Sequence, residues 1–126
     1  MPVVQINLNV ALAEQDKHDL LLSASRLVSE VLEKPLCDVM VSLTTADFVM
    51  AGSFDPAAFV DLRCLSGLQV EGATKRLCQG LLEVLRRLIP IDSSRVYINF
   101  AEVCPEYAWR FREGAAVCPK SAIGAR

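Results

Sequence analysis

The second residue of the chain is a proline whose nitrogen can become a basic amine. Met1 and Pro2 stand directly before a strand-like segment, and a proline in second position normally permits removal of the initiator methionine. With Met1 removed, the Pro2 nitrogen is a secondary amine, a group that can act as a general base when it is held beside a substrate. With Met1 retained, the same nitrogen belongs to an amide and cannot accept a proton. Pro2 is therefore the first candidate for a catalytic residue.

The five cysteines and the single histidine show no pattern of metal ligation. The cysteines are odd in number, form no C-x-x-C pair and do not cluster with His18, which argues against a zinc site or a disulfide framework. We expect buried free thiols instead, with His18 on a solvated helix surface, and we expect no metal and no cofactor. The cysteines are Cys37, Cys64, Cys78, Cys104 and Cys118.

Charge and hydropathy exclude two classes of partner. The net charge is -2, so the chain lacks the basic face that binding to a nucleic-acid backbone requires. No apolar run approaches the roughly 20 residues of a membrane span. Gln5, Asn7 and Asn9 interrupt the segment that would be the apolar part of a signal peptide. We therefore expect a cytoplasmic protein with no nucleic-acid and no membrane partner, and secretion without a signal peptide stays open.

The hydrophobic periodicity predicts the same three elements twice. Residues 3–10 alternate apolar and polar side chains as a strand does, residues 14–33 repeat apolar side chains at helical spacing, and residues 39–43 form a second strand. Pro35 ends the helical pattern. The second half repeats the order with a strand over 57–65, a helix over 68–88 and a strand over 95–100.

A doubled β-α-β unit predicts an α+β fold of two layers, in which two helices cover one face of a four-stranded mixed sheet. The apolar strand residues then belong beneath the helices. The uncovered face can meet water or other subunits, and the pattern alone does not choose between them. It also does not exclude a ferredoxin-like domain, which has the same element order. The polar residues expected on the uncovered face are Gln5, Asn7, Asn9, Tyr97 and Asn99.

Three short motifs follow one another on this pattern. Met1-Pro2 is followed by Asn7-Leu8-Asn9-Val10, the first helix is followed by Lys34-Pro35, and the last long strand reads Arg95-Val96-Tyr97-Ile98-Asn99-Phe100 with Trp109 beyond it. In these segments the chain resembles the macrophage migration inhibitory factor family, whose motifs are P-x-x-x-x-N-x-N-V, G-K-P and D-R-V-Y-I-N-Y with a tryptophan beyond. The resemblance predicts a tautomerase domain over residues 1–109, followed by a tail over 110–126 that Gly114, Pro119 and Gly124 suggest is irregular.

The resemblance implies a homotrimer with active sites between subunits, and keto–enol tautomerisation of phenylpyruvate-like or dopachrome-like aromatic α-keto acids. It makes Pro2 the general base. An apolar pocket and a neighbouring cation such as Lys34 would lower the pKa of its amine toward neutrality. The other pocket positions it implies are Lys34, Leu65, Tyr107 and Trp109, with Tyr97 and Asn99 supplied by the adjacent subunit.

The chain departs from the family pattern at positions that bear on the site. Asp38 stands where K-P-x-x-Y has tyrosine, which adds a negative charge near a pocket for a carboxylate and leaves the preferred substrate open. Residues 57–60 lack the C-x-x-C of human-type members, so we expect no thiol oxidoreductase activity and no need for any cysteine. Two other functions stay open: a signalling or interaction protein with a vestigial pocket, and a ferredoxin-like ligand-binding module.

Overall fold

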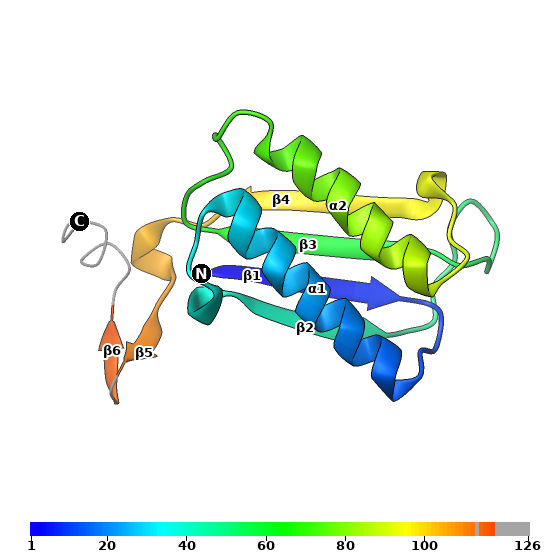
Figure 1. The fold of residues 1–126 in the computed structure, drawn as a ribbon, viewed down its shortest axis with the longest axis horizontal. Coiled ribbons are helices and arrows are strands. Elements are labelled where there is room, and N and C mark those ends of the chain that lie inside the picture. The colour runs from blue at the N-terminus through cyan, green and yellow to red at the C-terminus, as the bar shows by residue number, and fades with distance from the viewer. Residues whose placement is uncertain (113, 118–126) are drawn as a thin grey trace.

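The computed structural model describes residues 1–112 and 114–117 and contains two helices, a four-stranded sheet and a small hairpin (Figure 1). Short 3-10 turns precede β2, β4 and β5. In chain order the elements are β1 (Pro2–Leu8), α1 (Glu14–Leu32), η1 (Leu36–Asp38), β2 (Met40–Thr45), β3 (Ala58–Cys64), α2 (Ala73–Leu88), η2 (Ser93–Arg95), β4 (Val96–Glu102), η3 (Pro105–Tyr107), β5 (Arg110–Arg112) and β6 (Ala115–Val117). Within the described part of the chain, no helix is long and apolar enough to cross a membrane.

The sheet confirms the doubled β-α-β fold. Its strand order is β2-β1-β3-β4, with β1 parallel to β2 and β3 parallel to β4. The two units join through the antiparallel pair β1–β3 at the centre. Both helices lie across one face of the sheet, as Figure 1 shows.

The core lies between the helices and the sheet, where the alternation placed it. Val4, Ile6 and Leu8 of β1 are almost fully buried, as are Val60 and Leu62 of β3. α1 and α2 pack against each other closely at Gly80, since a Cβ there would lie only 2.7 Å from the methyl groups of Leu27. The alternation therefore separates a buried face, covered by the helices, from a face exposed to solvent, as expected for a half-covered sheet.

Helix boundaries differ from the sequence expectation where the backbone turns left-handed. α1 ends at Leu32 because Glu33 takes a φ of 55°, and Glu33 and Lys34 both donate backbone N–H bonds to the Ser29 carbonyl. α2 begins at Ala73 and not near residue 68, because Gly67 and Gly72 have φ values of 110° and 74°. Only glycine takes such conformations without strain, so the segment before α2 is a turn.

Strand boundaries shift by one to two residues. β1 ends at Leu8 because the Asn9 side chain takes over backbone partners: its Oδ1 accepts from Ala57 N (2.8 Å) and its Nδ2 donates to Asp55 O (3.0 Å). β2 runs on to Thr45, and β4 runs on to Glu102. Asn9, the second asparagine of the first motif, thus has a structural function.

The start of the predicted tail is ordered, which corrects the expectation of irregular structure there. Arg110 pairs with Val117 and Phe111 with Ala116 in the antiparallel hairpin β5–β6. Gly114 has a φ of 79° in the turn of this hairpin, a conformation that suits glycine. Pro119 and Gly124 lie outside the described residues.

Arg95 holds the loop between the two halves. Its guanidinium donates to four backbone carbonyls of this loop: Pro56 at 3.1 Å, and Met50, Ser53 and Asp55 at 3.0 Å each. A planar group with several donors suits this arrangement, which the point charge of lysine does not reproduce. The arginine of the third motif is therefore a structural clamp.

We expect Arg95→Lys to lower the free energy of unfolding by about 2 kcal/mol, since several hydrogen bonds to a charged donor are lost. Urea denaturation measures this change. The matched control is Arg76→Lys on the exposed surface of α2, which should leave stability nearly unchanged. Equal effects of the two substitutions would contradict the clamp.

Candidate active site

At one edge of the sheet, the start of β1 lies beside the C-terminal ends of β3 and β4 (Figure 1). Pro2 pairs with Cys64 across β1 and β3, and Cys64 pairs in turn with Glu102 at the end of β4. β2 begins at the same edge, since Val3 pairs with Met40. We call this the N-terminal edge. It is here that Pro2, the first candidate, lies buried at the end of the core.

Lys34 reaches the N-terminal edge from the end of α1. Its backbone is fixed by Ser29, whose hydroxyl donates to the Lys34 carbonyl at 2.6 Å. Its Nζ donates to the Ser66 hydroxyl at 3.1 Å, directly after Leu65. The half-buried lysine is therefore held against the end of β3 and is not simply a solvated residue at a helix terminus.

A hollow of about 370 Å³ opens beside the N-terminus. It combines apolar side chains with one acidic and one basic group, as small-molecule sites often do. The Trp109 indole that borders it is oriented by a hydrogen bond from Nε1 to the Glu106 carbonyl (3.0 Å). Residues lining the hollow include Met1, Val3, Asp38, Met40, Trp109 and Arg110.

The N-terminal amine lies in a partly desolvated, charged environment. Burial lowers the pKa of the Met1 amine below its ordinary value, and the cations of Arg110 and Lys34 lower it further. The Asp38 carboxylate and the Cys64 thiol act in the opposite direction, though less than burial does. Removal of Met1 would bring the terminal amine one residue further in, to Pro2. A base of this kind needs a pKa near the working pH.

Tyr97 and Asn99 are far from Pro2 within one chain. Tyr97 pairs with Phe59 on β3, five positions from Cys64, which corresponds to about 17 Å along a strand. Asn99 pairs with Asp61, about 10 Å along the strand from Cys64. Both side chains are exposed on the uncovered face. Pro2 pairs with Cys64, next to Leu65, and Lys34 bonds to Ser66, so these residues share the N-terminal edge. Trp109 borders the hollow, whereas Tyr107 is 81% exposed and does not.

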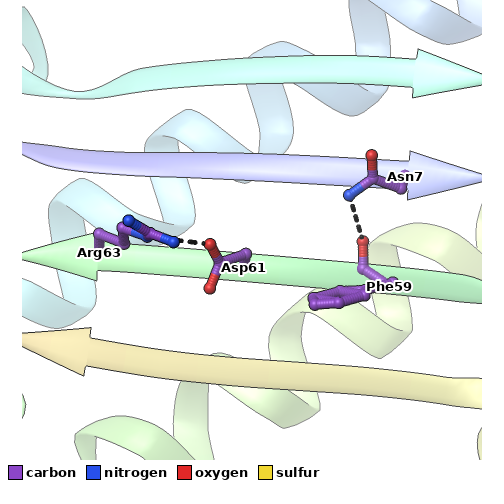
Figure 2. A network of polar contacts seen from close by, with 4 residues as sticks. All are labelled: Asn7, Phe59, Asp61 and Arg63. Carbon is purple, nitrogen blue, oxygen red and sulfur yellow. Dashed lines mark hydrogen bonds and ion pairs between the residues drawn. The ribbon is translucent and has the colours of Figure 1, made fainter.

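The uncovered face carries polar contacts between neighbouring side chains (Figure 2). Asn7 Nδ2 donates to the Phe59 carbonyl at 3.2 Å, and Arg63 Nε donates to Asp61 Oδ2 at 3.0 Å. The predicted side for Gln5, Asn7 and the β4 residues is thus confirmed. Exposed aromatic rings at Phe59 and Tyr97 lie among these polar groups.

The cysteines only partly fit the expectation of buried thiols. Cys64 is buried and Cys78 is half-buried, but Cys37 and Cys104 are exposed, because they lie in turns outside the core. Cys118 lies outside the described residues. Burial raises the pKa of the Cys64 thiol. It also raises the pKa of the Cys78 thiol, which is less deeply buried. Among the described residues, no group of three or more His, Cys, Asp or Glu side chains is placed to hold a metal ion.

The sequence interpretation missed one pair at the site. Arg110 Nη1 donates to Asp38 Oδ1 at 2.5 Å, and both residues line the hollow. Asp38 was noticed as a departure from the family pattern, whereas Arg110 was assigned to the tail. A basic residue directly after Trp109 was the available signal, but no local pattern connects it to residue 38.

Comparisons with known proteins identify the relatives of this chain. The family model of macrophage migration inhibitory factor matches residues 1–110. A macrophage migration inhibitory factor homologue of Trichinella spiralis is 31% identical over 104 residues, which cover 82% of this chain and 90% of the homologue.

Solved structures share the fold at lower identity. A macrophage migration inhibitory factor-like protein of Entamoeba histolytica has a TM-score of 0.81 at 24% identity, covering 88% of this chain and 95% of that one. A protein whose crystal structure was determined after inactivation by 2-oxo-3-pentynoate has a TM-score of 0.80 at 19% identity, covering 95% and 98% of the two chains. With the family model matched over nearly all of the described residues, this chain belongs to the macrophage migration inhibitory factor family.

Proposed function

We propose that the chain, once Met1 is removed, is a tautomerase of aromatic α-keto acids such as phenylpyruvate, with Pro2 as its general base. The observation that carries this proposal is the position of the Met1 amine, which removal of Met1 would pass to Pro2. That amine is partly buried at a hollow of small-molecule size, and the charge of Lys34 acts on it. Membership in the family supports the proposal. A structural neighbour inactivated by 2-oxo-3-pentynoate, by its name a 2-oxo acid, gives it chemical precedent.

The proposed reaction moves one proton between carbon and oxygen. The Pro2 nitrogen accepts a proton from the carbon next to the carbonyl, the electrons of that C–H bond form the carbon–carbon double bond, and the carbonyl oxygen takes up a proton. In this proposal Lys34, whose charge acts on the terminal amine, binds the substrate carboxylate, and Ser66 accepts a hydrogen bond from its ammonium. A donor near the carbonyl oxygen would stabilise the charge that develops there.

We propose further that the site is completed by a second subunit of a homotrimer. Tyr97 and Asn99 are too far from Pro2 in their own chain to act there, and they lie on the sheet face that the helices leave uncovered. On that face Tyr97 is 64% exposed and Phe59 is 38% exposed. Association of subunits through this face would bury both rings and bring a neighbour's Tyr97 to the hollow.

We expect the processed protein to tautomerise phenylpyruvate and Pro2→Gly to lose at least about tenfold in kcat/KM, the usual contribution of a positioned base. The assay follows enol formation by absorbance, and intact mass establishes whether Met1 is absent. The control is a chain that retains Met1, which should be inactive. Full activity with Met1 present would exclude Pro2 as the base. An inactive processed chain would favour the interaction-protein function instead.

We expect the thiols to be dispensable. Cys37 and Cys104 should be alkylated readily by iodoacetamide, whereas Cys64 should react slowly because burial raises its pKa and limits access. Cys64→Ala should leave the rate of tautomerisation unchanged. Peptide mapping and the same enzyme assay measure the two effects. Loss of activity on alkylating the exposed thiols alone would contradict this expectation.

We expect Pro2→Gly and Tyr97→Ala each to be weak alone and to recover part of the activity when refolded together. Some mixed trimers would then hold one site with Pro2 from one subunit and Tyr97 from another. Light scattering establishes the trimer, and differently tagged subunits establish mixing. The control is refolding each variant alone. A monomeric mass, or mixed trimers without recovery, would remove the shared site.

A further inference from the structure

An ion pair in the lining of the hollow joins two distant parts of the chain. Asp38 ends the short helix before β2, and Arg110 begins β5, 72 positions later. Both side chains line the hollow that also contains Met1. Their carboxylate and guanidinium meet at 2.5 Å, with side chains that are 21% and 39% exposed.

The position of the carboxylate poses a problem for the proposed substrate. Asp38 places a negative charge in the lining of the hollow that an anionic α-keto acid would occupy. Like charges in a partly desolvated site repel each other. The same carboxylate favours the protonated, inactive form of the terminal amine. A cation that engages Asp38 removes both disadvantages without changing Lys34.

We propose that Arg110 is a positioning residue that neutralises Asp38, so that the hollow admits a substrate carboxylate and the Pro2 amine is left free of an acidic partner. This inference rests on the proposed tautomerase function. It assigns the C-terminal hairpin a part in the site, because β5 carries Arg110. It also predicts that the site selects monoanionic substrates over their neutral esters.

The charged groups that act on the Met1 amine are the ones expected to act on the Pro2 amine after processing. Among the described residues these are Asp38, Arg110, Lys34 and the Cys64 thiol, besides burial itself. Glu102 lies beside Cys64 at the end of β4 and raises the pKa of its thiol. Arg110→Gln removes a cation and leaves Asp38 facing the amine, so the amine pKa rises. Asp38→Asn removes the anion, so the amine pKa falls.

Three variants of the processed protein test the proposal: Arg110→Gln, Asp38→Asn and the double variant. Arg110→Gln should raise KM for phenylpyruvate by about tenfold, as expected from the loss of one positive charge in a partly buried site. It should also move the acidic limb of the pH–rate profile to higher pH. Asp38→Asn should not raise KM and should move the limb to lower pH. The double variant should recover most of the loss, because the repelling charge is gone.

Two controls separate neutralisation from a merely structural ion pair. The first is the methyl ester of phenylpyruvate, whose KM should be unchanged in Arg110→Gln because the ester carries no charge. The second is Arg110→Lys, which keeps the positive charge and should retain low KM for the acid. If the ion pair were only structural, Asp38→Asn and Arg110→Gln would raise KM equally. They would do so both for phenylpyruvate and for its methyl ester.

A direct titration decides the inference even if turnover is absent. In protein labelled with ¹⁵N-proline, Pro2 is the only proline nitrogen that titrates once Met1 is removed, since the others are amides. Its pKa should rise in Arg110→Gln and fall in Asp38→Asn. No turnover by the processed wild type would overturn the proposed function, while unchanged Pro2 titration, or equal KM effects on acid and ester, would overturn the role of Arg110. If Arg110→Gln does not fold, the Pro2 titration in Asp38→Asn still tests the inference, because an unchanged Pro2 pKa in that variant would overturn it.

Discussion

The antiparallel pairing of β1 with β3 joins the two β-α-β units and sets the position of every group at the N-terminal edge. This register places Pro2 opposite Cys64, so the start of the chain meets the residues that follow β3. It also places Val4 opposite Leu62 and Ile6 opposite Val60, beneath the helices. A shift of one residue would turn these apolar side chains to the uncovered face, and for this reason burial specifies the register strongly. The core thus fixes the site.

Burial also prepares the chemistry at this edge. The terminal amine lies at the boundary between the buried core and solvent. Desolvation therefore opposes its charged form, while a substrate can still approach. Lys34 has its backbone bonded to Ser29 and its ammonium bonded to Ser66, so its charge is held and not mobile. A preorganised cation is more effective than one that must be ordered on binding. In the proposed function the same arrangement would bind a carboxylate and favour the neutral form of the amine.

The two faces of the sheet differ in the residues that they carry. The covered face contains the core, and the uncovered face carries amide contacts, an ion pair and exposed aromatic rings. Asn9 and Arg95, which belong to the family motifs, hold the loop between the units and do not line the hollow. A motif residue therefore need not be a site residue. In this chain the motifs describe the scaffold at least as much as the chemistry.

Periodicity in the sequence was sufficient for the number, type and order of the main elements, because side-chain alternation and helical spacing are local properties of an amphipathic chain. It was also sufficient to place Tyr97 and Asn99 on the uncovered face. It did not locate the start of α2, where two glycines with positive φ form a turn, nor the hairpin that begins at Arg110. Local propensity does not reveal turn conformation of this kind reliably.

What only the tertiary structure decided is which distant residues meet. The contact between Asp38 and Arg110 depends on how η1 and β5 lie around the N-terminal edge, and the contact of Lys34 with Ser66 depends on the end of β3 reaching the end of α1. Neither pair has a signature in the spacing of residues along the chain. The sequence by itself determined the amphipathic elements and Pro2 at the start of a strand. Packing of those elements brought charges from separate segments within hydrogen-bonding distance, because long-range contacts arise from burial of the whole core and not from any one segment.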